Sequence, residues 1–331
     1  GSYQVYRKDL SDLIRPPHGQ GDDIPTIWGT DSSETIEGTD GDDIIDGGKG
    51  DDTLNGGKGD DTYLYNSGDG NDTINDSEGS NTLSFGENIT TSNMYLFGSL
   101  GDLVGQADGQ TITLADLDQS SGSRFGRFKF SDGTIWETAD IMANTLFAGT
   151  EGGDNMNFQH FINGTTFDMG LGDDTIVGGQ GDDIYLFNIG DGNDNINDYS
   201  GADTLRFGAG ISTDNISLSA NDTDMLITLS DGQVITIANW NSANKSRLEQ
   251  FEFADGTVWG SSDIISNMVI TGSEGDGNVN NRYLTSGTTY DMGSGDDTVY
   301  GGKGDDSYLY NLGDGNDNIN DYSGADTLRF G

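Results

Sequence analysis

Aspartates recur along this chain at one fixed position in short glycine-rich phrases. The phrase GGKGDDTLN at residues 47–55 is followed at once by a second at 56–64, and closely similar wording returns at 178–186 and 301–309. Glycine permits turn dihedrals that other residues avoid. The Asp two residues after the last glycine supplies a hard oxygen ligand of the kind that calcium takes. Each phrase therefore predicts a turn that binds a divalent cation.

Thirteen aspartates share this position, and most neighbours are nine residues apart. Three steps are eleven residues long because each contains a two-residue insertion, such as Tyr65-Asn66, which predicts a bulge or a widened turn. One step of twenty residues in the second cluster predicts a degenerate half-coil. Glu34, Asn81 and Gly277 replace the Asp in other turns, which predicts weak or empty sites there. The candidate side-chain ligands are Asp43, Asp52, Asp61, Asp72, Asp154, Asp174, Asp183, Asp194, Asp203, Asp297, Asp306, Asp317 and Asp326.

The nine-residue spacing can be converted into a geometry. Nine residues divide into a six-residue turn and a three-residue strand, so two such units make one coil of a flattened solenoid. Turns on the same side of successive coils then stack about 4.8 Å apart, the normal strand spacing. Because calcium takes oxygens at about 2.3–2.6 Å, carboxylates on stacked turns can share one ion. Backbone carbonyls of the turns are a second set of candidate donors: Gly47, Lys49, Gly50, Gly56, Lys58, Gly59, Gly178, Gly181, Gly192, Gly301, Gly304 and Gly315.

These phrases resemble the G-G-x-G-x-D-x-U-x nonapeptides of the repeats-in-toxin (RTX) family. The resemblance implies a parallel β-roll with several Ca²⁺ ions between its turns, and export by the type I secretion machinery. The expected fold is therefore all-β, with β-roll (β-solenoid) blocks of nonapeptide repeats alternating with small β-rich intervening segments. Apolar residues such as Leu54 and Tyr63, two positions after their aspartates, are expected to form the core.

A longer repeat lies above the nonapeptide. The fifteen residues 194–208 are repeated identically at 317–331, and the segments between the Asp clusters resemble the haemolysin-type calcium-binding-related domain. We expect an N-terminal cap or linker at 1–28, β-roll blocks at 29–85, 148–207 and 271–331, and intervening segments at 86–147 and 208–270. Because the third module stops where its intervening segment would begin, the chain is expected to be part of a longer protein.

The intervening segments are expected to be β-structured. Residues 224–229 and 233–237 are β-rich runs joined by a Ser-Asp-Gly turn, which predicts a hairpin. Trp136 and Trp259 each follow an apolar strand, which favours a core role against the end of the roll over a carbohydrate-stacking role.

The composition is strongly acidic, with 57 acidic and 14 basic residues and a net charge of −43. Phosphates would be repelled, so nucleic acid is excluded as a partner. Stacked carboxylates about 5 Å apart repel by about 3 kcal/mol at a surface-like dielectric, so folding and calcium binding are expected to be one event. The chain has no cysteine, no signal-peptide pattern and no apolar run long enough to span a membrane. The resemblance implies that it is secreted or at the cell surface.

No constellation typical of an enzyme is present, and we expect no catalytic residue. The two histidines, His18 and His160, lie in no zinc-binding motif, and no nucleophile elbow occurs. In pairs such as Asp51-Asp52 the side chains of adjacent extended residues point opposite ways, so they form no glycosidase pair. The expected function is a calcium-binding region of a large secreted bacterial protein, which folds after export and presents or stabilises other domains. The alternatives are a ligand-binding adhesin or surface-layer array, or an accessory region of a secreted toxin or enzyme.

Overall fold

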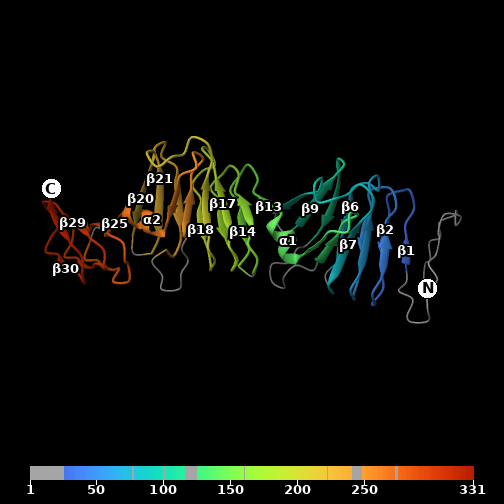
Figure 1. Cartoon of the computed structure of the whole chain (residues 1–331), viewed down its shortest axis with the longest axis horizontal. Coiled ribbons are helices and arrows are strands. Elements are labelled where there is room, and N and C mark those ends of the chain that lie inside the picture. The colour runs from blue at the N-terminus through green and yellow to red at the C-terminus, as the bar shows by residue number, and fades with distance from the viewer. Residues whose placement is uncertain are drawn as a thin grey trace. The chain divides into compact units, whose positions relative to one another are not determined.

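The computed structural model describes residues 26–76, 78–99, 102–115, 125–159, 161–221, 223–240, 248–272 and 275–331. The chain divides into two compact units, Gly1–Ala148 and Gly149–Gly331. Figure 1 shows that stacked short strands build each of them. Residues 1–25 of the expected N-terminal cap lie outside the described residues, as do His18 and His160.

The first unit contains a block of coils and an intervening segment. The strands of its coils are β1 (Thr26–Trp28), β2 (Thr35–Glu37), β3 (Ile44–Asp46), β4 (Thr53–Asn55), β5 (Thr62–Tyr65), β6 (Asp72–Ile74) and β7 (Asn81–Phe85). Its intervening segment contains β8 (Tyr95–Ser99), β9 (Asp102–Ala107), β10 (Gln110–Leu114), β11 (Phe125–Lys129), β12 (Ile135–Glu137), the helix α1 (Thr138–Ala143) and β13 (Thr145–Ala148).

The second unit repeats this plan and adds a further block. Its first coils are β14 (Asn155–Asn157), β15 (Thr166–Asp168), β16 (Thr175–Val177), β17 (Ile184–Phe187), β18 (Asn195–Asn197) and β19 (Thr204–Phe207). Its intervening segment is β20 (Ile216–Ala220), β21 (Met225–Leu229), β22 (Val234–Ile237), β23 (Gln250–Glu252), β24 (Val258–Gly260), α2 (Ser261–Ser266) and β25 (Met268–Thr271). The last coils are β26 (Asn278–Asn280), β27 (Thr289–Asp291), β28 (Thr298–Tyr300), β29 (Ser307–Tyr310), β30 (Asn318–Asn320) and β31 (Thr327–Phe330).

Every second strand of a block pairs in parallel, which is the geometry of a two-sided solenoid. In the first unit, β1, β3, β5 and β7 form one sheet, and β2, β4 and β6 are neighbours in the other. Ile45 lies beside Tyr63, and Tyr63 lies beside Leu83, so one coil is two nonapeptides long. The expected all-β solenoid of parallel coils is thereby confirmed.

The core of each coil follows from the alternation of side chains along a strand. The second residue of β3, β4 and β5 points inward, and these residues, Ile45, Leu54 and Tyr63, are at most 1% exposed. The two-residue insertion forms a widened turn rather than a bulge, because Tyr65 stays in register with Phe85. The N–H of Asn66 donates to the carboxylate of Asp69 at 2.6 Å within that turn.

The intervening segment of the second unit continues the sheets of the roll. β22 pairs in parallel with β18. It forms the expected hairpin with β21, which in turn pairs in antiparallel fashion with β20. β25 then pairs in parallel with β20. On the other side, β23 pairs in parallel with β19. In the first unit β10 joins β6, and β11 joins β7, in the same way.

Aromatic side chains close the core where the intervening segment meets the roll. Phe207 stacks on Phe253 with ring centroids 5.0 Å apart, and Trp259 meets Phe253 edge-on at 5.2 Å. In the first unit, Trp136 has the same edge-on relation to its own phenylalanine partner, at 4.7 Å. Both tryptophans are half-buried, so they pack at the margin of the core rather than inside it.

Candidate metal centres

The aspartates singled out from the sequence stand where each turn enters its strand. Ten of them are no more than 2% exposed, namely Asp43, Asp52, Asp61, Asp72, Asp174, Asp183, Asp194, Asp203, Asp297 and Asp306. Asp154 and Asp317 are half-buried and Asp326 is exposed. A carboxylate is rarely buried unless a partner compensates its charge. Each of these buried aspartates therefore requires such a partner.

One oxygen of most of these carboxylates is held by the backbone of the preceding coil, whereas Asp43 and Asp154 accept from Thr39 and Thr150 of their own turns. The N–H of Asp43 donates to Asp61 Oδ1 at 2.8 Å, and the N–H of Asp174 donates to Asp194 Oδ1 at 3.0 Å. The same bond recurs at every step between stacked turns. This ladder fixes the carboxylates in a row along each edge of the roll.

The second oxygen of many of these carboxylates is buried and unpaired. The oxygens concerned, which accept no hydrogen bond from any described residue, are Asp43 Oδ1, Asp52 Oδ2, Asp61 Oδ2, Asp174 Oδ2, Asp194 Oδ2, Asp203 Oδ2 and Asp297 Oδ2. Such groups are rare in folded proteins, and an ion is one of the established reasons for them. Hard anionic oxygens in stacked rows form the donor set that suits Ca²⁺. The residues present therefore fit calcium.

The turn glycines leave room for these oxygens and for the stacked backbone. A Cβ on Gly47 would lie 2.6 Å from Asp52 Oδ2. The carbonyl oxygens of Gly50 and Gly59 approach the next turn so closely that a Cβ on Gly70 or Gly79 would lie 1.8 or 1.7 Å from them. Only glycine tolerates this approach.

The other candidate carbonyl donors belong to the same stacked turns. Carbonyls of Gly47 and Gly56 approach Gly29 and Gly38, and those of Gly181 and Gly304 approach Gly201 and Gly324, each with a hypothetical Cβ within 2.2 Å. The α-carbons of Gly178 and Gly301 lie beside tyrosine hydroxyls, and Gly192 and Gly315 lie over the carbonyls of the preceding coil. Lys49 and Lys58 are in the turns, where their side chains pair with Asp31 at 3.6 Å and Asp40 at 3.2 Å.

The burial and crowding of these carboxyl groups raise the pKa values of several of them. Burial raises the pKa of Asp72, Asp183 and Asp194 to about 7 each. Burial, followed by the charge of Asp198, raises the pKa of Asp203 to about 9. Without a cation, Asp72, Asp183 and Asp194 would be partly protonated at neutral pH, and Asp203 would be protonated.

Several positions without the aspartate retain the strand of the coil but lack a charge. Thr165 and Thr288 stand at the ligand position before β15 and β27, so the degenerate half-coil of the second block still contains a strand. Asn81 accepts from the N–H of Asp61 at 2.9 Å through Oδ1 and donates to the carbonyl of Glu78 at 3.0 Å through Nδ2. This amide is satisfied as a neutral group.

The sequence reasoning missed a second set of buried acids. Asp198 lies beside Asp183 and Asp203, and it accepts a hydrogen bond from the hydroxyl of Tyr185. Glu249, far along the chain, continues the ladder by accepting from the N–H of Asp203 at 2.8 Å. The recurring tripeptide Ile-Asn-Asp at 74–76, 196–198 and 319–321 was the signal that could have revealed the first of these. No signal of this kind marks Glu249, because the contact spans 46 residues.

Comparison with known proteins gives the same assignment. The RTX calcium-binding nonapeptide repeat matches residues 28–63, 66–88, 170–191, 190–213 and 293–314. The chain carries RTX calcium-binding repeats. The haemolysin-type calcium binding protein related domain matches residues 224–263, within the second intervening segment. RTX repeats of this kind imply several Ca²⁺ ions and indicate a calcium-binding region of a secreted protein.

Similarity to whole proteins is limited. No protein of curated function matches the sequence. Among solved structures, the extracellular lipase LipA from Serratia marcescens is 20% identical over 66% of this chain and 38% of the lipase, with a TM-score of 0.22. The aligned region thus spans well under half of that enzyme, and so low a TM-score supports no conclusion about this RTX chain.

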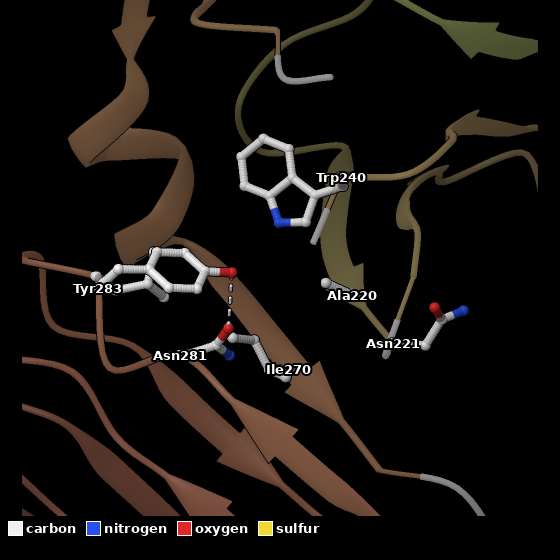
Figure 2. Close-up of a pocket in the computed structure, with 7 residues that line it drawn as sticks. Ala220, Asn221, Trp240, Ile270, Asn281 and Tyr283 are labelled. Atoms are coloured by element: carbon white, nitrogen blue, oxygen red, sulfur yellow. Dashed lines mark hydrogen bonds between the residues drawn. The ribbon is translucent and has the colours of Figure 1, made fainter. Parts of the chain in front are cut away.

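A small pocket in the second unit is lined by Trp240, Ile270, Asn281 and Tyr283, among others (Figure 2). The hydroxyl of Tyr283 donates to Asn281 Oδ1 there at 3.4 Å, and the space suits roughly one water molecule. Within the described part of the RTX chain, no helix is long and apolar enough to cross a membrane.

Proposed function

We propose that this chain is a calcium-driven folding region of a larger secreted protein. It leaves the cell unfolded through a type I secretion system, folds when it meets extracellular calcium, and then presents or stabilises other domains. Its role is structural rather than catalytic. The observation that carries the proposal is a row of buried carboxylate oxygens on stacked glycine turns. These oxygens accept no hydrogen bond from any described residue.

The free energies support coupling of folding to metal binding. Like charges about 4.8 Å apart repel by about 3.5 kcal/mol at an effective dielectric constant of 20. A few such pairs equal the total stability of a domain, about 5–15 kcal/mol. Calcium between the carboxylates turns this repulsion into attraction. A chain of this kind stays unfolded where free calcium is scarce and folds near the millimolar levels typical of extracellular sites.

A calcium titration of the full chain tests the proposal. The radius of gyration by small-angle scattering and the strand signal by circular dichroism are followed together, with magnesium as the control ion. A cooperative compaction and gain of strand near millimolar calcium, with magnesium ineffective, is expected because Mg²⁺ gives up its water reluctantly. A compact, strand-rich chain in excess chelator would contradict the proposal.

A further inference from the structure

Aspartate replaces the first glycine of the nonapeptide at three turns, at positions 76, 198 and 321. In the second block this brings three carboxylates together, since one oxygen each of Asp183, Asp198 and Asp203 lies within 4.8 Å of the others. All three residues are about 1% exposed. Among the described residues of this block, no other three carboxylates meet in this way. The turn at Asp194 holds a second buried aspartate, Asp191, whose Oδ2 accepts from the N–H of Asn188 at 2.6 Å.

The cluster has unused binding capacity. Asp198 Oδ1 and Asp203 Oδ2 are buried and accept no hydrogen bond from the described residues. The third member, Asp183, is fixed through both oxygens, which accept from the N–H groups of Thr165 at 2.9 Å and Gly179 at 3.0 Å. Two unpaired oxygens beside a fixed third carboxylate form a site for a cation.

The added carboxylate is positioned by a buried tyrosine. Tyr185 is 0% exposed, its ring stacks on Phe167 with centroids 5.3 Å apart, and its hydroxyl donates to Asp198 Oδ2. The turn accommodates this hydroxyl because residue 178 is glycine, where a Cβ would lie only 1.9 Å from it. Asp198 is therefore held in place before an ion arrives.

We propose that Asp183, Asp198 and Asp203 form a three-carboxylate calcium site that is tighter than the ordinary turns and fills first. The affinity of calcium sites depends on the number of charged ligands and on the rigidity of the site. Three carboxylates meet here, and Asp183 and Asp198 are each held by hydrogen bonds. The inference rests on the proposed function and specifies which turn starts the folding. The third block repeats the cluster with Asp306, Asp321 and Asp326, of which the last two are exposed.

The first block provides a natural comparison. There, Tyr63 donates to Asp76 at 2.5 Å in the same way, but Asn81 stands where the second block has Asp203. This turn keeps the tyrosine–aspartate pair but has an amide in place of the third carboxylate, and its Asp76 Oδ1 accepts from the N–H of Glu78 at 3.2 Å. The substitution Asn81→Asp should therefore create a third tight site.

The test counts the ions that the full chain retains against a competing chelator of known affinity. Asp198→Asn keeps an acceptor for the tyrosine hydroxyl and removes one charge, so the chain should retain one tight ion fewer, with affinity at that turn lowered by about tenfold or more. Asn81→Asp should retain one more. Asp182→Asn, at an exposed neighbour of Asp183 whose Oδ1 accepts from the N–H of Ala202 at 2.8 Å, removes an equal charge and should leave the count unchanged. Tyr185→Phe keeps all three carboxylates, so it should lower the calcium affinity at that turn by less than Asp198→Asn does.

The result separates this inference from the proposed function. If Asp198→Asn and Asn81→Asp both leave the count of tight ions unchanged while calcium still compacts the chain, the three-carboxylate site is refuted and the proposed function stands. If calcium compacts neither the native chain nor the variants, the proposed function fails first. Because Asn81→Asp adds a site rather than removing one, a folding defect in Asp198→Asn cannot decide the outcome.

Discussion

Replacing one ladder aspartate by asparagine should change stability in opposite directions with and without calcium. Asp174 is suited to this because it accepts from the N–H of Asp154 at 2.7 Å and donates its own N–H to Asp194 at 3.0 Å. Its Oδ2 is buried and unpaired. Asparagine keeps the acceptor that the ladder needs, as Asn81 does in the native chain. Asp174→Asn therefore removes the charge and little else.

The magnitude follows from the stacking. Neighbouring carboxylates on successive coils lie about 4.8 Å apart, so each pair repels by about 3.5 kcal/mol at an effective dielectric constant of 20. Asp174 has two such neighbours, of which Asp154 is half-buried and better screened. Above about pH 8, where Asp194 with its pKa of about 7 is ionised, removing the charge of Asp174 should stabilise the metal-free fold by up to about 7 kcal/mol. In calcium the same change removes a ligand and should destabilise the fold.

Two titrations measure the two signs. In chelator, both chains are driven to fold with an osmolyte that favours burial, and circular dichroism should show that Asp174→Asn needs less osmolyte than the native chain. In saturating calcium, its urea midpoint should be lower. Asp182→Asn, at an exposed aspartate in a nearby turn, is the control and should shift neither curve appreciably. A loss of stability for Asp174→Asn in both conditions would refute the reasoning from repulsion.

Three further outcomes are expected. Asp194, with a pKa of about 7, represents carboxyls that bind protons in the fold but not in the unfolded chain. Acidification from about pH 7 to 4 should therefore stabilise the metal-free fold and weaken calcium binding. Circular dichroism at several fixed calcium levels checks both signs, and a metal-free fold that weakens in acid would contradict them. Gly192→Ala should raise the calcium concentration needed for folding, because φ is +125° and the Cβ would lie 1.7 Å from a carbonyl oxygen. In the control Gly232→Ala, the Cβ meets no described atom within 4 Å, so the change should cost only the strain of its positive φ, about 1–3 kcal/mol. Equal effects of the two substitutions would refute the close-stacking argument. Trp259→Ala removes the edge-on contact with Phe253 and should lower the free energy of unfolding in calcium by about 2–4 kcal/mol, measured with urea; an unchanged midpoint would contradict the core role.

Much of the fold could be predicted from the sequence because its signals are local. The nine-residue spacing fixes a turn and a strand in each repeat, and the apolar residue two positions after the Asp fixes which face is buried, as at Leu54. The widened turn at Asn66 was half-predicted, since the insertion was visible but its form was not. The way the intervening strands extend the sheets was not predicted, because pairing such as β22 with β18 depends on contacts between distant residues.

The sequence alone determined the repeating turn, the metal class and the inward-facing core, since each is a property of residues a few positions apart. Only the tertiary structure decided which acids meet. Asp198 joins Asp183 because one coil brings residues fifteen apart to the same turn edge, and Glu249 reaches Asp203 because an intervening strand docks beside β19. The stacking of coils brings residues that are distant in the sequence into contact. It therefore decides how many negative charges each cation must balance.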